Sequence, residues 1–325
     1  MFSRNKKKTL GVILSLMLLF LVLDLVASLY LVNFALSPHR RTSQEAFEKL
    51  YGRSGECRPW IDSLRQAGAW RDTFAMINGT RLHALYIPSA KPTNKVVVLV
   101  HGYRDSNISM LNIGRVYYRQ LGFNLFLPDL YAHGQSDGNH IQMGWNDRLD
   151  VMKWLSVANH IFKGDSAQTQ MVIHGVSMGA ATTMALSGEK LPPCVKCLVE
   201  DCGYTSVHDE FVHELSDTAM LKVPFAIPRW PILPTASMIC RLKYGWNFEE
   251  ASMLKQVKKC RLPMMFIHGD NDDFVPTAMV YPLYHAKSAP KELYMGRGSR
   301  HARTYVDHSA QYTARLKTFV EKYMY

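Results

Sequence analysis

The sequence predicts an α/β fold, in which helices flank a mostly parallel central sheet, preceded by an N-terminal transmembrane helix. The sheet is predicted by short, continuous apolar runs that alternate with longer helical patterns along the chain. Such runs are typical of parallel strands that are buried on both faces, and the alternation is typical of α/β proteins. One long apolar stretch near the N-terminus predicts the transmembrane helix.

The composition agrees with a globular domain. The chain has 325 residues, of which 47% are hydrophobic and 20% are charged. These fractions exclude disordered and collagen-like proteins. No short period repeats along the chain, which argues against a solenoid or a propeller. Six cysteines are too few for a disulfide scaffold of this length.

The first 36 residues predict a membrane anchor. Residues 1–9 form a basic tail, and the apolar run Leu10–Leu36 follows it directly. About 20 apolar residues suffice to cross the hydrocarbon core of a bilayer. A cleaved signal peptide is the alternative, but its apolar region is normally about 7–15 residues long and precedes a small-residue cleavage site. The length of the run therefore favours an uncleaved anchor.

The basic tail also sets the expected orientation. Cationic flanks remain in the cytoplasm, so everything after Ser37 is expected outside it, in a single-pass protein of the cell membrane. Asp24 interrupts the apolar run. A central acid costs about 3 kcal/mol on insertion scales, and the many apolar residues of the run outweigh it. Asp24 either pairs with a partner helix or is simply tolerated by the long span.

Residues 37–69 are expected to connect this anchor to a domain that occupies residues 70–325. Thr42 and Glu45 have the spacing of a capping box, in which the two residues satisfy each other's backbone N–H groups. This spacing predicts a short helix that ends near Gly52.

The domain shows a regular succession of strand and helix patterns. Asn78-Gly79 lies between the first two strand patterns and predicts a hairpin. The expected strands are Phe74–Ile77, Arg81–Ile87, Val96–Val100, Asn124–Leu127, Met171–His174, Val195–Val199, Met264–Ile267 and Glu292–Met295. The expected helices are Met110–Leu121, Trp145–Phe162, Met178–Ser187, Thr277–Ala286 and Val306–Tyr323.

An insertion at residues 205–254 interrupts this succession. Four prolines lie between Pro224 and Pro234, and proline breaks helices because it lacks an N–H group and clashes with the preceding turn. We therefore expect no long helix around them. The insertion forms either a small cap over a site or a packed surface excursion.

A nucleophile motif lies between an expected strand and an expected helix. The pentapeptide Gly175-Val176-Ser177-Met178-Gly179 has the pattern G-x-S-x-G in the strand–turn–helix context that this motif requires. The glycines allow a sharp turn, which lifts the serine hydroxyl above the edge of the sheet. The pattern predicts Ser177 as a nucleophile and the backbone N–H of Met178 as one donor of an oxyanion hole.

A serine nucleophile needs a base, and the base needs an acid that orients it. Asp272 follows one expected strand and His301 follows the next. Both therefore lie at the edge where open α/β sheets place their sites. The chain order serine, aspartate, histidine is the one expected with this motif. Asp270 and Asp273 are neighbouring alternatives for the acid.

From about Asp72 to the C-terminus, the sequence resembles the α/β-hydrolase superfamily, and most of all its small membrane-anchored bacterial members described as esterases or S9/S33-type serine peptidases. Five segments carry the resemblance: His101-Gly102-Tyr103, Asp129–Gly138, Gly175–Gly179, His268–Pro276 with the pattern H-G-x-x-D-x-x-V-P, and the loop Gly296–His301. The resemblance implies the α/β-hydrolase fold and makes Asp272 the acid. Some relatives place the acid one strand earlier, where Asp201 lies.

Further residues gain a role from the same resemblance. It implies that the N–H of Tyr103 is the second donor of the oxyanion hole. His133 lies in a segment similar to the superfamily pattern R-G-H-G-x-S and is expected to be structural. Arg300 departs from the pattern, because many relatives have a small residue before the histidine. It is either a cation that favours anionic substrates or a solvated side chain.

The remaining histidines and cysteines predict no cofactor and no metal site. The chain has 13 histidines but no H-E-x-x-H motif. Cys194 and Cys197 have redox or zinc spacing, with Cys202 nearby, but no second C-x-x-C pair exists. Buried free cysteines are the simpler interpretation, and a disulfide stays open for a domain outside the cytoplasm.

We therefore predict a serine hydrolase that cleaves carboxylic esters through an acyl-enzyme. A serine peptidase or a thioesterase on the same residues is the alternative, as is a membrane-tethered binding protein without activity. The expected partners are a small-molecule ester or acyl substrate and the lipid bilayer. The net charge of +11 does not indicate nucleic acid, because the basic residues outside the tail are dispersed, apart from the short cluster Lys255–Arg261, and no reader motif accompanies them. The oligomeric state is not specified by the sequence.

Overall fold

The chain forms two compact units. The first consists of Met1–Ser37 and His208–Ala251, and the second consists of Pro38–Val207 and Ser252–Tyr325. A computed structural model describes residues 2–166, 168–216, 227–288 and 290–324.

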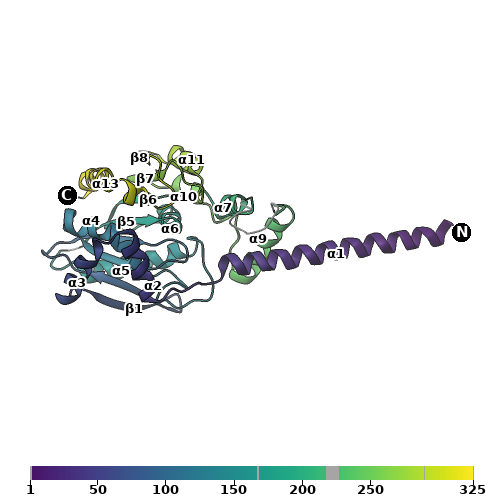
Figure 1. Cartoon of the computed structure of the whole chain (residues 1–325), viewed down its shortest axis with the longest axis horizontal. Helices are drawn as coiled ribbons and strands as arrows, with labels where there is room; N and C mark the ends of the chain where they lie inside the picture. The colour runs from purple at the N-terminus through teal and green to yellow at the C-terminus, as the bar shows by residue number, and fades with distance from the viewer. Residues whose placement is uncertain (1, 167, 217–226, 289, 325) are drawn as a thin grey trace. The chain divides into compact units, whose positions relative to one another are not determined.

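The second unit is built on a central sheet (Figure 1), whose eight strands lie in the order β1-β2-β4-β3-β5-β6-β7-β8. The strands are β1 (Arg71–Ile77), β2 (Thr80–Ile87), β3 (Lys95–Val100), β4 (Asn124–Pro128), β5 (Gln170–Val176), β6 (Val195–Asp201), β7 (Met264–Gly269) and β8 (Lys291–Gly296). From β4 to β8 all neighbours are parallel, while β2 is antiparallel to both β1 and β4. The predicted mostly parallel sheet is confirmed, and each expected strand is present.

The burial of the strands explains why they are readable in the sequence. Every residue of β4 and of β7 is buried, and so is most of β3 and β5. Strands covered on both faces need apolar side chains on both faces, which gives continuous apolar runs. The hairpin between β1 and β2 is also confirmed, because Asn78 and Gly79 both have positive φ angles of 50° and 80°, as a type I′ turn requires.

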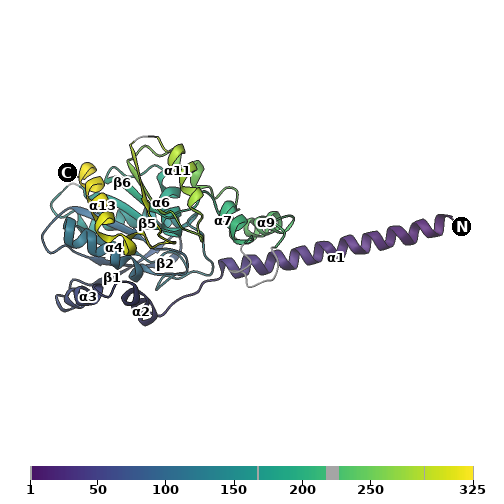
Figure 2. The same ribbon diagram turned by 45° about the horizontal axis from the view of Figure 1, so that its top comes forward.

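Helices cover both faces of the sheet. The helical elements of this unit are α2 (Ser43–Arg53), α3 (Cys57–Gln66), η1 (Asn107–Met110), α4 (Leu111–Val116), η2 (Tyr117–Leu121), α5 (Asp147–Phe162), α6 (Met178–Ser187), α10 (Met253–Val257), η3 (Thr277–Met279), α11 (Val280–Ala286), α12 (Thr304–Asp307) and α13 (Ser309–Tyr323). Side chains of α2, α3, α4 and α13 share one apolar core with one face of the sheet (Figure 2). The helices α5, α6 and α11 contact the strands from the other face.

The segment 37–69 is more than a connector. The predicted capping box is present, because Glu45 N–H donates to Thr42 Oγ1 and Thr42 N–H donates to the Glu45 carboxylate. The helix α2 continues to Arg53 rather than ending at Gly52. It is followed by α3, which the sequence patterns do not predict, and both helices pack onto the sheet.

Two predicted helices are divided in the structure. The segment expected as a helix over Met110–Leu121 is split into the end of η1, the short helix α4 and the π-helical turn η2. The C-terminal helix is split at His308 into α12 and α13. In both cases the apolar side chains still face the core, which is why the periodicity alone does not reveal the breaks.

The first unit consists of the long helix α1 (Phe2–Leu36), most of α7 (Val207–Glu214) and α9 (Ile232–Tyr244). The expectation that the prolines prevent a long helix is wrong for α9, which has 13 residues and begins directly after Pro231. Pro234 lies in its first turn, where the N–H group that proline lacks has no acceptor within the helix. The other two prolines of the cluster, Pro224 and Pro228, precede the helix, and Pro224 lies outside the described residues.

The helix α1 contacts α9 along its C-terminal part (Figures 1 and 2). The hydroxyl of Thr235 donates to the Asp24 carboxylate at 2.6 Å, and the hydroxyl of Ser28 donates to the carbonyl of Ile232 at 3.1 Å. Lys243 Nζ donates to the side-chain oxygen of Asn33 at 2.9 Å. Asp24 therefore has a partner on a second helix. Of the two interpretations of this acid, the structure favours pairing over simple toleration by the long span.

By length and composition, the described helix over Lys6–Leu36 can cross a membrane, with a mean hydropathy of 2.7 in its apolar window. Every residue from 10 to 23 is exposed. The basic tail does not form a separate segment, because α1 already begins at Phe2.

The two ends of the inserted stretch 208–251 meet in the second unit. Ser206 and Ser252 form an isolated antiparallel bridge. The N–H of Leu254 donates to the carbonyl of Thr205 at 3.0 Å. The chain therefore leaves the second unit and returns to it at neighbouring positions.

A buried pair of acids marks the first turn of α5. One carboxylate oxygen of Asp147 accepts the N–H of Gly144 at 2.8 Å, and the other has no partner among the described residues. Burial, and next the charge of Asp150, raise the pKa of Asp147 to about 8. The unfolded chain ionises this acid near pH 3.9, so folding is opposed once the buried group must give up its proton.

We expect Asp147→Asn to stabilise the protein increasingly as the pH rises. The pKa of Asp147 is raised in the folded state. The stability that the protonated carboxyl contributes is therefore fully present below about pH 4 and is lost as the pH rises towards 8. Asparagine can still accept the N–H of Gly144 and never ionises. The difference in unfolding temperature between variant and unchanged protein should grow from pH 5 to pH 9. Asp62→Asn, on the exposed side of α3, is the control, and an equal difference at both pH values for Asp147→Asn would contradict the expectation.

Candidate active site

The segment from β5 to α6 turns sharply at Ser177. Its backbone has φ 59° and ψ −121°, a conformation that is rare for residues other than glycine and that concentrates at functional sites. The N–H of Ser177 donates to the carbonyl of Asp201 at 2.8 Å, which ties the turn to the end of β6. The turn places the hydroxyl at the carboxyl edge of the parallel strands, as the motif predicts.

The two glycines of the motif are required by close backbone contacts. A Cβ atom on Gly175 would lie 1.9 Å from the carbonyl oxygen of Gly179, and one on Gly179 would lie 2.0 Å from the carbonyl oxygen of Val100. Both distances are far shorter than any van der Waals contact. The strand and the helix can approach this closely only where no side chain intervenes.

Gly175→Ala is therefore expected to lower the free energy of unfolding by about 3 kcal/mol, the upper end for overpacked interiors. The matched control is Gly52→Ala in α2, because no atom lies within 4 Å of a Cβ there. Alanine in place of a helical glycine should stabilise by about 0.5 kcal/mol. Thermal unfolding of the purified protein measures both effects, and equal unfolding temperatures for the two variants would refute the steric argument.

His301 lies between Ser177 and Asp272. Its Nε2 is 2.8 Å from Ser177 Oγ, and its Nδ1 is 2.8 Å from Asp272 Oδ2. Because an ionised carboxylate can only accept hydrogen bonds, Nδ1 carries the proton and Nε2 is left to accept the proton of the hydroxyl. The structure therefore brings together the three residues that the sequence predicts as nucleophile, base and acid.

Asp272 is held ionised by its surroundings. Burial acts to raise its pKa, but hydrogen bonds to His268 and His301 and the charges of both rings outweigh burial and lower the pKa to about 2. Its Oδ1 also accepts the backbone N–H groups of Phe274 and Val275 at 3.1 and 3.0 Å. These contacts fix the carboxylate in the orientation that His301 requires.

Known proteins resemble this chain in sequence. The model of the serine aminopeptidase S33 family matches residues 91–244. A Bacillus subtilis protein named YqkD, described as uncharacterised, is 26% identical over 270 residues, which are 79% of this chain and 85% of YqkD. The protein bem46 of Schizosaccharomyces pombe is 24% identical over 203 residues, which are 62% of this chain and 59% of bem46.

Solved structures share the fold. The esterase Pf2001 of Pyrococcus furiosus has a TM-score of 0.63 at 19% identity, over 79% of this chain and 93% of the esterase. The acylaminoacyl peptidase of Pyrococcus horikoshii has a TM-score of 0.58 at 14% identity, over 78% of this chain and 42% of the peptidase. The chain has the α/β-hydrolase fold. The fold class predicted from the sequence is thereby confirmed.

The other candidate acids of the hydrolase have different partners. Asp270 accepts the N–H of Gly298, and Asp273 forms an exposed ion pair with Arg300 at 2.6 Å. Asp201 accepts the hydroxyl of Tyr312 at 2.8 Å. Burial raises the pKa of Asp201 to about 6. Of the four candidate acids, Asp272 is the one that contacts the ring of His301.

The loop after β3 approaches the nucleophile of the hydrolase. A Cβ on Gly102 would lie 3.3 Å from the Cβ of Ser177, so the adjacent Tyr103 belongs to the surroundings of the hydroxyl. Met178 begins α6, and the first N–H groups of a helix have no acceptor within it. Both predicted oxyanion donors therefore come from segments that border Ser177.

Two buried histidines hold this loop in place. The N–H of Leu130 donates to His101 Nε2 at 3.0 Å, and the N–H of Arg104 donates to His133 Nε2 at 3.2 Å. Burial lowers the pKa of His133 to about 3, so its ring is neutral and can accept. These contacts agree with the structural role expected for His133.

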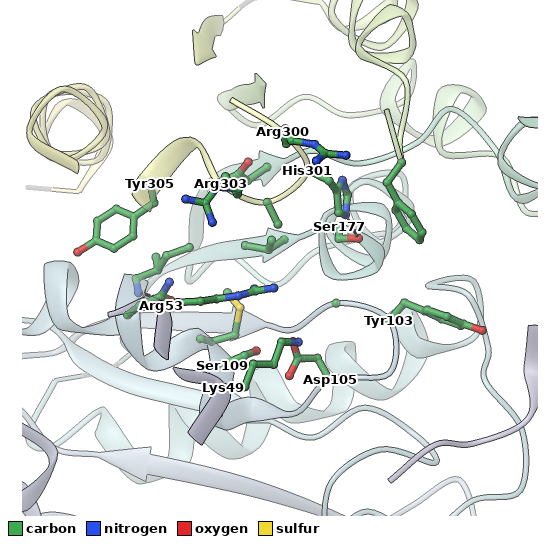
Figure 3. Close-up of a pocket in the computed structure, with 18 of the residues that line it drawn as sticks. Lys49, Arg53, Tyr103, Asp105, Ser109, Ser177, Arg300, His301, Arg303 and Tyr305 are labelled. Atoms are coloured by element: carbon green, nitrogen blue, oxygen red, sulfur yellow. Dashed lines mark hydrogen bonds and ion pairs between the residues drawn. The ribbon is translucent and has the colours of Figure 1, made fainter. Parts of the chain in front are cut away.

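Ser177 and His301 open into a pocket of about 490 Å³ (Figure 3). Its lining includes Lys49 and Arg53 from α2, and Arg303 from the loop before α12. The sequence reasoning missed Lys49 and Arg53, because they belong to the segment expected to be a plain connector. No local pattern connects α2 with a site that is more than a hundred residues away along the chain.

The charges of the pocket are unevenly balanced. Lys49 pairs with Asp105 at 2.6 Å, Arg300 with Asp273 at 2.6 Å, and Arg303 with Asp307 at 2.9 Å. Among the described residues, no acidic side chain lies within ion-pair distance of Arg53. Arg300, the cation noticed in the sequence, is thus neutralised locally, and Arg53 is the lining cation without such a partner.

The cysteines of the hydrolase are all buried free thiols, in agreement with the simpler interpretation of the sequence. Cys202, Asp272 and His301 are close enough for their ligand atoms to share an ion. However, burial keeps the pKa of the Cys202 thiol well above its ordinary value, and a metal ligand must be the thiolate. His301 and Asp272 already bond each other, so these donors do not fit a metal.

His268 is a residue of the site whose role the sequence analysis did not assign. Its Nε2 lies 3.3 Å from Asp272 Oδ2, and both side chains are completely buried. It is the histidine of the H-G-x-x-D-x-x-V-P segment, four residues before the aspartate. The four-residue spacing between His268 and Asp272 is the signal that could have indicated a second imidazole ring beside this carboxylate.

Proposed function

We propose that the protein is a serine hydrolase that cleaves carboxylic esters through an acyl-enzyme. Ser177 is the nucleophile, His301 the general base and acid, and Asp272 the residue that orients the ring. The observation that carries this proposal is the pair of 2.8 Å contacts that His301 makes, with Ser177 on one side and Asp272 on the other.

Acylation begins when His301 Nε2 takes the hydroxyl proton of Ser177 and Oγ bonds the carbonyl carbon of the ester. The carbonyl oxygen becomes an oxyanion, which the N–H groups of Met178 and Tyr103 stabilise. The carbon–oxygen bond to the leaving group then breaks. The alcohol departs with the proton from His301, and the acyl group remains on Ser177.

Deacylation repeats these steps with water. His301 removes a proton from a water molecule, whose oxygen attacks the acyl carbon. The second oxyanion collapses, the bond to Ser177 Oγ breaks, and Oγ recovers the proton from His301. Asp272 remains ionised throughout and stabilises the imidazolium that forms twice.

Amides and thioesters can follow the same route, so the leaving group must be tested. The family model describes a serine aminopeptidase, and similar structures include an esterase and a peptidase. Purified protein should be given p-nitrophenyl butyrate, the p-nitroanilide of butyrate and a butyryl thioester. We expect the largest kcat/KM for the oxygen ester. A faster anilide would identify a peptidase, a faster thioester a thioesterase, and no turnover of any would support the non-catalytic alternative.

The cations of the pocket support an ester that carries a negative charge. Burial lowers the pKa of Lys49, and Arg53 is one of the like charges that lower it further. An anionic group of the substrate would relieve this repulsion and give Arg53 a partner. A half-ester of a dicarboxylic acid has the required chemistry.

Arg53→Gln should therefore reduce kcat/KM for mono-p-nitrophenyl glutarate about tenfold, since a hydrogen bond to a charged group contributes roughly 1.5 kcal/mol. The value for neutral p-nitrophenyl butyrate should stay unchanged. Arg58→Gln on α3, which does not line this pocket, is the matched control. An equal loss for the two esters would show that the arginine acts on the fold and not on the charge.

We also propose that α1 anchors the enzyme in the cell membrane, with the basic end in the cytoplasm and the hydrolase unit outside. The support is the apolar length of Lys6–Leu36 and the exposure of its first turns. Protease treatment of intact cells tests the orientation. A hydrolase unit that is degraded only after lysis would place it in the cytoplasm.

A further inference from the structure

The helix α9 has an apolar face that no described residue covers. Met238 is 56% exposed and Leu242 is 80% exposed, and Trp230 just before the helix is 74% exposed. Pro234, Met238 and Leu242 are spaced four residues apart, so they lie on one face. A soluble protein seldom leaves several large apolar side chains together in water.

This face runs alongside α1. The neighbouring side of α9 carries Thr235 and Lys243, which bond Asp24 and Asn33 of α1. Another side of α9 carries Leu233, Ser237 and Cys240, which are buried. At the same level α1 also exposes apolar side chains, since Tyr30 is 67% exposed and Val26 is 59% exposed.

The position of α9 along α1 can be compared with the thickness of a bilayer. The last cation before the apolar run is Lys8, so the hydrocarbon begins near Leu10. A span needs about 20 residues, which reaches Leu29. Asp24 and Ser28 lie before that point, and they bond Thr235 and Ile232 in the first turn of α9. The first turn of α9 therefore lies within the hydrocarbon thickness.

The other end of α9 lies further out. Lys243 bonds Asn33, nine residues beyond Asp24, which corresponds to about 14 Å along a helix. Arg241 and Lys243 thus lie where lipid head groups begin, on either side of Leu242 at the outer end of the apolar stripe. Cations at that level are attracted to anionic head groups.

We infer that α9 is inserted into the outer leaflet beside α1, with Met238 and Leu242 against lipid acyl chains and with its cationic end among the head groups. The inference rests on the proposed anchoring role of α1. It gives Asp24 a function as well, because a carboxylate bonded to Thr235 and Ser28 fixes α9 on the anchor. A partner at this depth must offer acyl chains, so the occupant is the bilayer itself.

Spin labels on single cysteines test this placement in the full-length protein. The variants are Met238→Cys and Leu242→Cys, with Leu18→Cys in the middle of the span and Asp62→Cys on α3 as references. The protein is reconstituted in vesicles of phosphatidylcholine and phosphatidylglycerol. The six native cysteines are buried, and the unsubstituted chain measures their background labelling.

We expect the labels at 238 and 242 to collide with oxygen, as at Leu18, and to lose the collisions with a water-soluble nickel complex that the label at 62 shows. If the labels at 238 and 242 were as accessible to nickel as the label at 62, while the label at 18 stayed protected, the inference would be overturned. Protection from both oxygen and the nickel complex would show that a second copy of the chain or another protein, and not lipid, covers this face of α9. Nickel accessibility at Leu18 itself would instead refute the anchor.

Discussion

The Ser177→Ala enzyme is expected to hydrolyse p-nitrophenyl esters about a million-fold more slowly than the unchanged enzyme, the scale of loss when a serine nucleophile is removed from such a triad. Alanine removes the oxygen that bonds the acyl carbon, so no acyl-enzyme can form. Covalent labelling by a fluorophosphonate should disappear together with turnover. Binding of a neutral product should be retained, because Ser177 contributes only part of the pocket lining.

Ser109→Ala is the control for this experiment. Ser109 also lines the pocket, but its hydroxyl donates to the carbonyl of Ser106 and not to a histidine. Labelling of this variant should equal that of the unchanged enzyme. If Ser177→Ala were still labelled, the nucleophile would have to be another residue.

Asp272→Asn should lower kcat by about 10⁴-fold with little change in the fold, as expected when the acid of a triad becomes an amide. The carboxylate oxygen of Asp272 accepts from His301 Nδ1. An amide can present an N–H group there instead, which favours the tautomer whose Nε2 carries the proton. That tautomer cannot take the proton of Ser177.

Asp201→Asn separates the two acids that the superfamily offers. Asp201 is buried and bonds Tyr312, so its substitution should affect stability more than turnover. A greater loss of kcat in Asp201→Asn than in Asp272→Asn would assign the acid to the end of β6. Unfolding temperatures measured for both variants keep a folding defect apart from a catalytic one.

The sheet was predictable because its strands are buried on both faces. A residue such as Val98 faces a covering layer on one side and its neighbour Val97 faces the other, so the buried part of β3, Val96–Val100, must be apolar on both faces. The hairpin was predictable because Asn78-Gly79 adopts left-handed conformations easily. Local patterns of this kind depend on a few neighbouring residues only.

The grouping of Ser177, Asp272 and His301 was predictable for a topological reason. Each follows a parallel strand, and the carboxyl ends of parallel strands meet at one edge of the sheet. The three strands β5, β7 and β8 are near neighbours in the sheet. Sequence order and strand direction therefore already restrict these side chains to a small region.

The contacts of α2 and α9 were not predictable in this way. Arg53 lines the pocket through the packing of α2, and Thr235 meets Asp24 across 211 positions of the chain. Such contacts depend on how separate helices pack, and one sequence carries no periodic signal for them. The prolines before α9 also obscured the helix itself.

The bridge between Ser206 and Ser252 has a consequence for how this enzyme could change in evolution and in the laboratory. Because the two ends of the inserted stretch meet, residues 208–251 can be exchanged for a short turn without moving a strand of the sheet. Removal of α1 alone would leave the surface of α9 that it covers without a partner. On the proposal that α1 anchors the protein, a water-soluble version of the enzyme requires both deletions together, and a single cut after Ser37 should leave the enzyme bound to α1.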